Sequence, residues 1–201
     1  GSGTANLVSL GSSDAYVLTL NADGTYVRAI RFGGANLEEG RNLVTDSSGN
    51  VFATGLFTTT GNSPVDFDPG VGTANLLAEK TNVYVVKLTR PGAYVWARQF
   101  GGSDGATEKI WSVATDSVGN AIVAGSWTEN IDLNTSAATS PTAVSVRLLT
   151  VSSSDAFIAK LRNTDGYTDT TAPTGSLQSK TIRSSTRSYG HTTTEEGFVY
   201  L

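Results

Sequence analysis

The chain contains no cysteine, no methionine and a single histidine, His191. Without cysteine it has no disulfide bonds, thiolate metal sites or cysteine nucleophiles. One histidine excludes a multi-histidine metal site within one chain. A Ser-His-Asp triad would depend on His191, although no Gly-x-Ser-x-Gly elbow is present. Because a primary translation product begins with methionine, we expect this chain to be a processed or excised part of a longer protein.

Charge is also scarce: charged residues make up 16% of the chain, and the net charge is −4. Nucleic-acid binding needs a basic stripe that neutralises phosphates, and the sequence has none. No apolar run approaches the roughly 18 residues of a membrane-spanning helix. We therefore expect neither a nucleic-acid partner nor a membrane span.

Aromatic and turn-forming residues are plentiful, with three Trp, seven Tyr, seven Phe and 22 Gly. This content of aromatic residues is typical of a chain that folds around a core. Abundant serine, threonine, glycine and asparagine favour short strands and turns over long helices. The composition predicts an all-β fold.

Several phrases occur more than once, in the same order. "TDSSGNVFATG" at Thr45–Gly55 matches "TDSVGNAIVAG" at Thr115–Gly125, and "GTANL" occurs at Gly3–Leu7 and Gly72–Leu76. An apolar stretch occurs three times, as "DAYVLTL" at Asp14–Leu20, "NVYVVKL" at Asn82–Leu88 and "DAFIAKL" at Asp155–Leu161. The repeat unit is about 70 residues long, and residues 1–167 hold two full copies and the first strand of a third.

The sequence of each unit predicts four short antiparallel strands joined by glycine-containing turns. The fourth strand, "VFATGLFT" or "AIVAGSWT", is apolar or small on both faces, as expected for a strand between two other layers. Repeated four-stranded units that stack face to face describe the blades of a β-propeller. A β-sandwich is the competing fold, but it does not explain so regular a repeat.

"DAFIAKL", "FGG", "TDSSGNVFATG" and "VDFDPGVGTANL" together resemble the bacterial SBBP-type β-propeller repeats. The resemblance covers residues 1–167 and implies a propeller in an extracellular or cell-surface setting. It implies no catalytic residues, because the positions shared in that family are structural.

Two features depart from a closed propeller. A unit of about 70 residues is long for a four-stranded blade, and the excess follows the fourth strand, at residues 59–81 and 129–154. Two units are also too few to close a ring, which needs at least about four blades. We therefore expect either a part of a larger propeller or an assembly of chains. The strand of the third copy could complete a neighbouring blade.

Residues 168–201 do not continue the repeat. "TDTTAPTGSLQSK" is rich in threonine, serine and proline and indicates a linker. The residues beyond it are too few for a core of their own. They form either a docked strand segment or the start of a truncated immunoglobulin-like domain.

"VDFDPG" at Val65–Gly70 is the candidate metal site. Asp66 and Asp68 lie two positions apart, and oxygen ligands of this kind suit Ca²⁺. The second unit has Asp132 in the corresponding place but Asn134 where the second aspartate would be. The alternative is a turn in which the aspartates accept hydrogen bonds from backbone amides.

Other repeated residues have simpler explanations. Asp46, Gly49 and Asn50, like their partners Asp116, Gly119 and Asn120, predict a tight turn rather than a metal site. Glu38 and Glu108 align between the units. This alignment favours a repeated surface role over one active site, so we expect no enzymatic activity.

Tryptophans supply the candidate ligand-binding residues. Trp127 aligns with Phe57 and is predicted to lie in the core. Trp96 aligns with Arg28, and Trp111 with Arg41, so both are predicted to lie near a surface where they could stack on sugar rings. We expect a non-enzymatic structural or adhesive surface protein, with other domains of a longer chain or neighbouring subunits as partners. The alternative is a carbohydrate-binding propeller, in which calcium is the candidate cofactor.

Overall fold

The computed structural model describes residues 6–78, 80–101, 108–128, 130–132, 147–149 and 155–167, with the short pairs 192–193 and 199–200. Every regular element in these ranges is a β-strand, and every strand pairs in antiparallel fashion. The all-β prediction is confirmed. The strands are β1 (Ala15–Leu20), β2 (Tyr26–Phe32), β3 (Glu38–Thr45), β4 (Val51–Thr58), β5 (Val65–Asp66), β6 (Asn75–Leu76), β7 (Thr81–Leu88), β8 (Tyr94–Phe100), β9 (Lys109–Thr115), β10 (Ala121–Trp127), β11 (Asn130–Asp132), β12 (Arg147–Leu149), β13 (Asp155–Leu161), β14 (Thr192–Thr193) and β15 (Val199–Tyr200).

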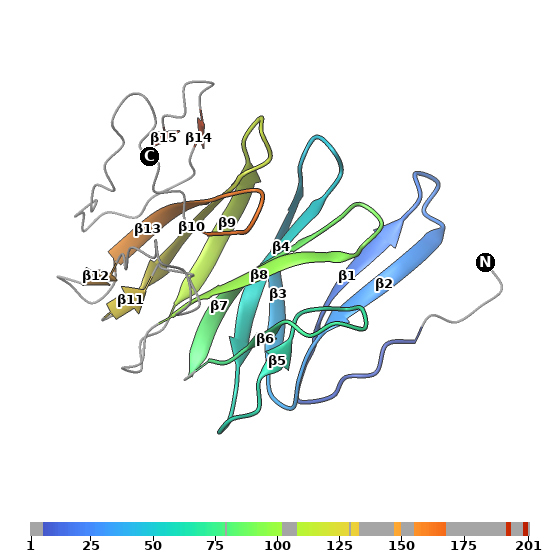
Figure 1. Ribbon diagram of the computed structural model, residues 1–201, viewed down its shortest axis with the longest axis horizontal. Coiled ribbons are helices and arrows are strands. Elements are labelled where there is room, and N and C mark those ends of the chain that lie inside the picture. Colours follow the sequence, from blue (N-terminus) through green and yellow to red (C-terminus); the bar gives the residue numbers. More distant parts are fainter. Residues whose placement is uncertain are drawn as a thin grey trace.

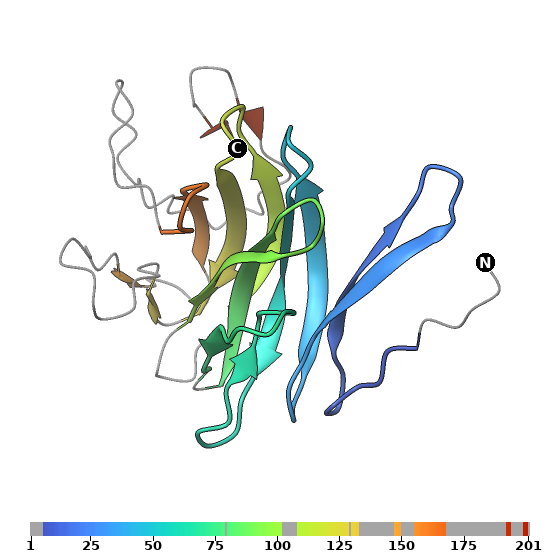
Figure 2. The same cartoon turned by 45° about the vertical axis from the view of Figure 1, so that its right-hand side comes forward.

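Three larger sheets lie side by side (Figure 1). The N-terminal sheet contains β1 and β2, the central sheet has the order β3-β4-β7-β8, and the third sheet has the order β13-β10-β9. The pairs β5-β6, β11-β12 and β14-β15 form separate two-stranded ladders. The described strands form stacked open sheets rather than a closed ring (Figure 2).

The central and third sheets each combine strands from two repeat units, whereas the N-terminal sheet holds two strands of the first unit alone. The sequence predicts such pairing only for the strand of the third copy. The central sheet takes β3 and β4 from the first unit and β7 and β8 from the second. In the same way, β13 of the third copy pairs with β10 along its whole length. The strand of the third copy thus joins the sheet of the second unit, while its expected role in completing a propeller blade stays a prediction.

The connection after β2 explains why the sheets cross the unit boundaries. Gly33 and Gly34 end β2, and a Cβ on Gly33 would lie 2.2 Å from the carboxyl carbon of Asp14. The chain then crosses to the next sheet, and an isolated parallel bridge joins Leu37 to Ser13, just before β1. In the new sheet β3 pairs with β4 rather than with β2, and the other edge of β4 pairs with β7 of the next unit.

The repeated turns are built as predicted. In the turn before β4, the carboxylate of Asp46 accepts hydrogen bonds from the amides of Ser48 and Asn50, both at 2.9 Å. Gly49 has a φ of 78°, in the region that favours glycine. The equivalent turn before β10 repeats these features around Asp116 and Gly119. The turn interpretation is confirmed for both copies.

Two apolar clusters hold the three sheets together. Between the N-terminal and central sheets, Ala15, Val17 and Phe32 pack against residues that include Phe57 and Tyr84. The cluster between the central and third sheets includes Phe52, Val83, Val85, Trp96, Phe100, Ile110, Val123, Trp127 and Phe157. Trp127 is fully buried, as predicted. Apolar side chains are therefore buried on both faces of the central sheet.

A repeated glycine lets a ring pack flat on the neighbouring strand. Gly55 of β4 lies directly opposite Tyr84 of β7. A Cβ on Gly55 would lie 1.8 Å from the carbonyl oxygen of Glu39 and 2.7 Å from the Tyr84 ring. In the third sheet Gly125 lies opposite Phe157, and its Cβ would lie 2.6 Å from that ring. Glycine is thus required at this strand position in both sheets.

Candidate functional site

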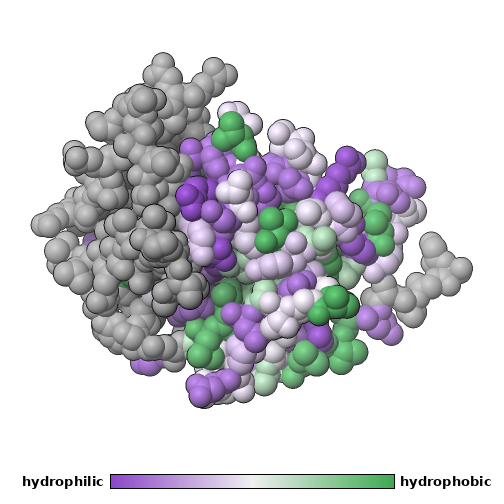
Figure 3. Space-filling model, viewed as in Figure 1, coloured by the Kyte–Doolittle hydropathy of each residue, from purple (hydrophilic) through white to green (hydrophobic). Residues whose placement is uncertain are grey.

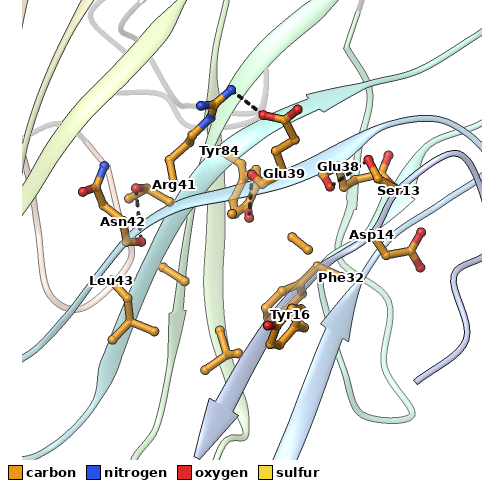
Figure 4. A pocket seen from close by; sticks show the side chains of 15 residues that line it. Ser13, Asp14, Tyr16, Phe32, Glu38, Glu39, Arg41, Asn42, Leu43 and Tyr84 are labelled. Atoms are coloured by element: carbon orange, nitrogen blue, oxygen red, sulfur yellow. Dashed lines mark hydrogen bonds and ion pairs between the residues drawn. The ribbon is translucent and has the colours of Figure 1, made fainter. Parts of the chain in front are cut away.

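A hollow lies between the N-terminal and central sheets. It is a cleft of about 600 Å³, open to solvent, between β1 on one side and β3 and β4 on the other. Its walls include Ala15 and Val17 from β1 and Leu43 and Ala53 from the central sheet. Figure 4 shows Phe32 with Tyr16 on one side of β3. We call this hollow the β1–β3 cleft.

Charged and polar side chains of β3 line the rim of the β1–β3 cleft (Figure 4). Arg41 forms an ion pair with Glu39, and both side chains are substantially exposed. Arg41 is the extra residue of a β-bulge, since Gly40 and Asn42 pair with successive residues of β4. In the third sheet Trp111 is the extra residue at the equivalent bulge. A bulge redirects a side chain, which explains why these positions accept such different residues.

Glu38 lies at the start of β3, buried at the end of the β1–β3 cleft. Its Oε2 accepts a hydrogen bond of 2.7 Å from the amide of Gly34. Its Oε1 is buried without a hydrogen-bond partner among the described residues. Burial raises the pKa of the Glu38 carboxyl, the Gly34 amide partly offsets this rise, and the charge of Asp14 adds to it.

The expected surface role for Glu38 and Glu108 is wrong. Both side chains are only 1% exposed. Each stands where the chain enters the first strand of a sheet, and Glu38 binds the backbone of the preceding glycine turn. The repetition of this glutamate therefore reflects a buried structural position.

Replacing Glu38 with glutamine should make the stability less sensitive to pH. The pKa of Glu38 is higher in the folded than in the unfolded chain, so the wild type loses stability as the pH rises through this range. Glu38→Gln removes that loss. The difference in free energy of unfolding, variant minus wild type, should become more positive between about pH 4 and about pH 7. Urea denaturation at a series of pH values measures it.

Glu39→Gln is the matched control for this measurement, because Glu39 is the adjacent and more exposed carboxylate. An equal pH trend in both variants would contradict the assignment to Glu38.

Asp66 is the last residue of β5, and Asp68 lies in the turn that joins β5 to β6. Oδ1 of Asp66 accepts hydrogen bonds from the amides of Asp68 at 2.9 Å and Ala74 at 2.8 Å. Oδ1 of Asp68 accepts one of 2.8 Å from the amide of Gly70. These contacts match the turn alternative. In the described ranges, no group of three or more histidine, cysteine, aspartate or glutamate side chains is placed to hold a metal ion.

The corresponding region of the second unit is described only in part. The backbone of Asp132 belongs to β11. Asn134 lies outside the described residues, as does His191. The interpretation of residues 168–201 as a linker with a terminal segment likewise falls almost wholly outside them.

Trp96 is buried, so its predicted surface position is wrong. Its indole is 2% exposed and lies edge-on to Phe52, with ring centroids 5.8 Å apart. Its Nε1 donates a hydrogen bond of 3.0 Å to the carbonyl of Asn163. The alignment with Arg28 misled because Arg28 belongs to the two-stranded N-terminal sheet, whereas Trp96 is covered by the residues after β13.

Trp111 has the predicted surface position. It is 62% exposed. Its Nε1 donates a hydrogen bond of 3.1 Å to Ser126, and the ammonium of Lys109 lies 5.8 Å from the ring centroid. Trp111 is therefore the one of the two predicted ligand-binding residues whose ring can meet a sugar in this arrangement.

Sequence reasoning missed the β1–β3 cleft and the open side of the N-terminal sheet. Tyr16, Leu18 and Leu20 are 64%, 48% and 49% exposed. Their equivalents in β7 are Tyr84, Val86 and Leu88, which are at most 1% exposed. The signal was present in the alignment of "DAYVLTL" with "NVYVVKL", which assigns both stretches to the same strand position.

No model of a known protein family matches the chain, and comparison with curated proteins finds no relative. Among the described residues, no helix is long and apolar enough to cross a membrane.

Proposed function

We propose that the protein is a non-enzymatic structural or adhesive component of an extracellular surface, in which its sheets act as propeller-type blades completed by further blades. The observation that carries this proposal is the exposed apolar face of the N-terminal sheet. We call it the open face. It is formed by Leu7, Tyr16, Leu18, Leu20, Tyr26 and Ala29.

The pairing pattern supports blades as the unit of assembly. The central sheet has four antiparallel strands, and its first strand, β3, contacts the first strand of the third sheet, β9. A β-propeller likewise repeats four-stranded antiparallel sheets around an axis. The resemblance of the repeat to SBBP-type propellers points to the same architecture and to an extracellular setting.

The open face has a covered counterpart within the same chain. Tyr84, Val86 and Leu88 of the central sheet are buried against the N-terminal sheet. Their equivalents on the open face are about half exposed or more, and two of them, Tyr16 and Leu18, line a hollow of about 450 Å³. In Figure 3, hydrophobic (green) side chains lie among polar ones at the right-hand end, where Figure 1 places β1 and β2. An exposed apolar face of this kind marks an interaction surface.

The mass of the native particle tests the proposal. If blades are completed between chains, light scattering should give a particle heavier than the 20.9 kDa chain. Leu18→Lys places a charge on the open face and should shift the particle toward the monomer. Val71→Lys is the control, because Val71 is fully exposed in the β5–β6 turn. A stable monomer at all concentrations would contradict assembly between chains.

The same mass measurement, repeated with a chelator, tests whether calcium is bound. If Asp66 and Asp68 bind calcium in the assembly, EDTA should reduce the particle mass. An unchanged mass would leave them as turn residues, in line with their backbone hydrogen bonds. The carbohydrate alternative depends on Trp111 alone among the predicted residues, and we place it second.

A further inference from the structure

β1 has one free edge in the described part of the chain. It pairs with β2 on one side, and no described strand pairs with its other side, where the isolated bridge of Ser13 with Leu37 precedes β1. In the central sheet the equivalent strand β7 pairs with both β4 and β8. Unpaired backbone groups along a strand are a template for another strand. The free edge of β1 borders the β1–β3 cleft.

The two other copies of this strand show what lies on the corresponding edge. β4 pairs with β7 from Val51 opposite Leu88 to Thr58 opposite Thr81. β10 pairs with β13 from Ala121 opposite Leu161 onward in the same register. A fourth-strand segment of the repeat therefore occupies this position in both cases.

In both of these strand pairs, an aromatic residue of one strand lies opposite a glycine of the other. Gly55 lies opposite Tyr84, and Gly125 lies opposite Phe157. Tyr16 occupies the same position of β1, and its ring is 64% exposed. The missing neighbour of β1 is therefore expected to carry a glycine opposite Tyr16.

The far wall of the β1–β3 cleft also lacks its cover. Leu43 of β3 is 54% exposed. Its equivalent in β9, Val113, is partly buried against the apolar cluster between the central and third sheets. This difference follows from the neighbours on the preceding side: β9 contacts both β3 and β4 of the central sheet, whereas β3 contacts β1 of the N-terminal sheet much less extensively.

We propose that the free edge of β1 and the β1–β3 cleft form a strand acceptor. Its occupant is an antiparallel strand of the β4 or β10 type, with a glycine opposite Tyr16 and apolar residues over Leu43, donated by another copy of the repeat unit. This inference rests on the proposed function, because it identifies the partner that completes the N-terminal sheet. Main-chain hydrogen bonds supply affinity in such strand addition, and alternate side chains supply specificity.

A peptide that copies the donor strand tests the acceptor directly. The probe is a fluorescein-labelled peptide of residues 117–128, and its control carries valine in place of Gly125. We expect the first peptide to bind the full chain in fluorescence anisotropy, and the control to bind at least about tenfold more weakly. In the third sheet, a Cβ on Gly125 would lie 2.6 Å from the Phe157 ring. A valine in the peptide would therefore clash with the Tyr16 ring if that ring packs on the peptide in the same way.

Hydrogen exchange locates the bound peptide. Amides in Ala15–Leu20 should exchange more slowly in the complex, and Tyr16→Asp should weaken binding. Tyr16 is exposed, so this variant should fold as the wild type does. Equal binding of both peptides, no binding of either, or protection elsewhere than β1 would overturn the proposal.

The outcome is independent of the particle mass. A heavy particle that protects no β1 amides and binds no peptide would keep the proposed assembly but overturn the strand acceptor. A monomer that binds the peptide at β1 would keep the acceptor and overturn assembly between chains.

Discussion

Gly55→Ala should destabilise the protein by at least about 3 kcal/mol, the upper end of the usual cost of overpacking. The added Cβ would lie 1.8 Å from the carbonyl oxygen of Glu39, which is held in the β3–β4 ladder. It would also press on the Tyr84 ring at 2.7 Å. Relief requires β3 and β7 to separate from β4 in the middle of the central sheet. Guanidinium denaturation followed by tryptophan fluorescence measures the loss.

Gly40→Ala is the matched control, because Gly40 pairs with Gly55 across the same ladder. The nearest atom to its added Cβ would be the Cβ of Ala15, at 4.0 Å. This variant should stay within about 0.5 kcal/mol of the wild type. If both variants lost the same stability, the close approach of the Tyr84 ring and Glu39 carbonyl to Gly55 would not be the cause.

Trp127→Ala should cost about 3–5 kcal/mol, the usual range for removing a buried aromatic ring. Trp127 is fully buried between the central and third sheets, and its ring centroid lies 6.2 Å from that of Phe157. Its Nε1 has no hydrogen-bond partner among the described residues, so truncation removes packing without leaving a polar group unpaired. The loss should appear as a lower denaturation midpoint.

Trp111→Ala makes the same chemical change at an exposed site and should cost no more than about 1 kcal/mol. Its ring loses only the contacts with Ser126 and Lys109. A loss at Trp111 as large as that at Trp127 would contradict the arrangement of the two faces of the third sheet.

The sequence predicted the longer strands, β1 to β4, β7 to β10 and β13, because each has a clear apolar pattern between turn residues. It did not predict the short strands of the β5–β6 and β11–β12 ladders, which have no such pattern. The turns at Asp46 and Asp116, the buried Trp127 and the all-β class all follow from such local patterns. The pairing of strands did not follow from them. Whether β4 joins the sheet of its own unit or of the next is decided by contacts distant in sequence, such as the register of Val51 with Leu88.

The candidate site was harder to predict for the same reason. Glu38 looks like a surface residue in a sequence of charged neighbours, and only the fold buries it against Gly34. Trp96 aligns with an arginine, yet residues after β13 cover it. Tyr16 follows the pattern of a buried residue but is exposed, because no described sheet packs on its face of the N-terminal sheet as that sheet packs on Tyr84.

The crossing of unit boundaries by the central and third sheets has a mechanical consequence. A force applied along the chain cannot separate the first repeat unit from the second at a flexible connection, because β4 and β7 are joined by an eight-residue ladder. The β10–β13 ladder joins the second unit to the third copy in the same way. Neighbouring units are thus joined by antiparallel ladders of backbone hydrogen bonds. A protein built from many such units would resist tension at every joint, which suits a component of a surface exposed to shear.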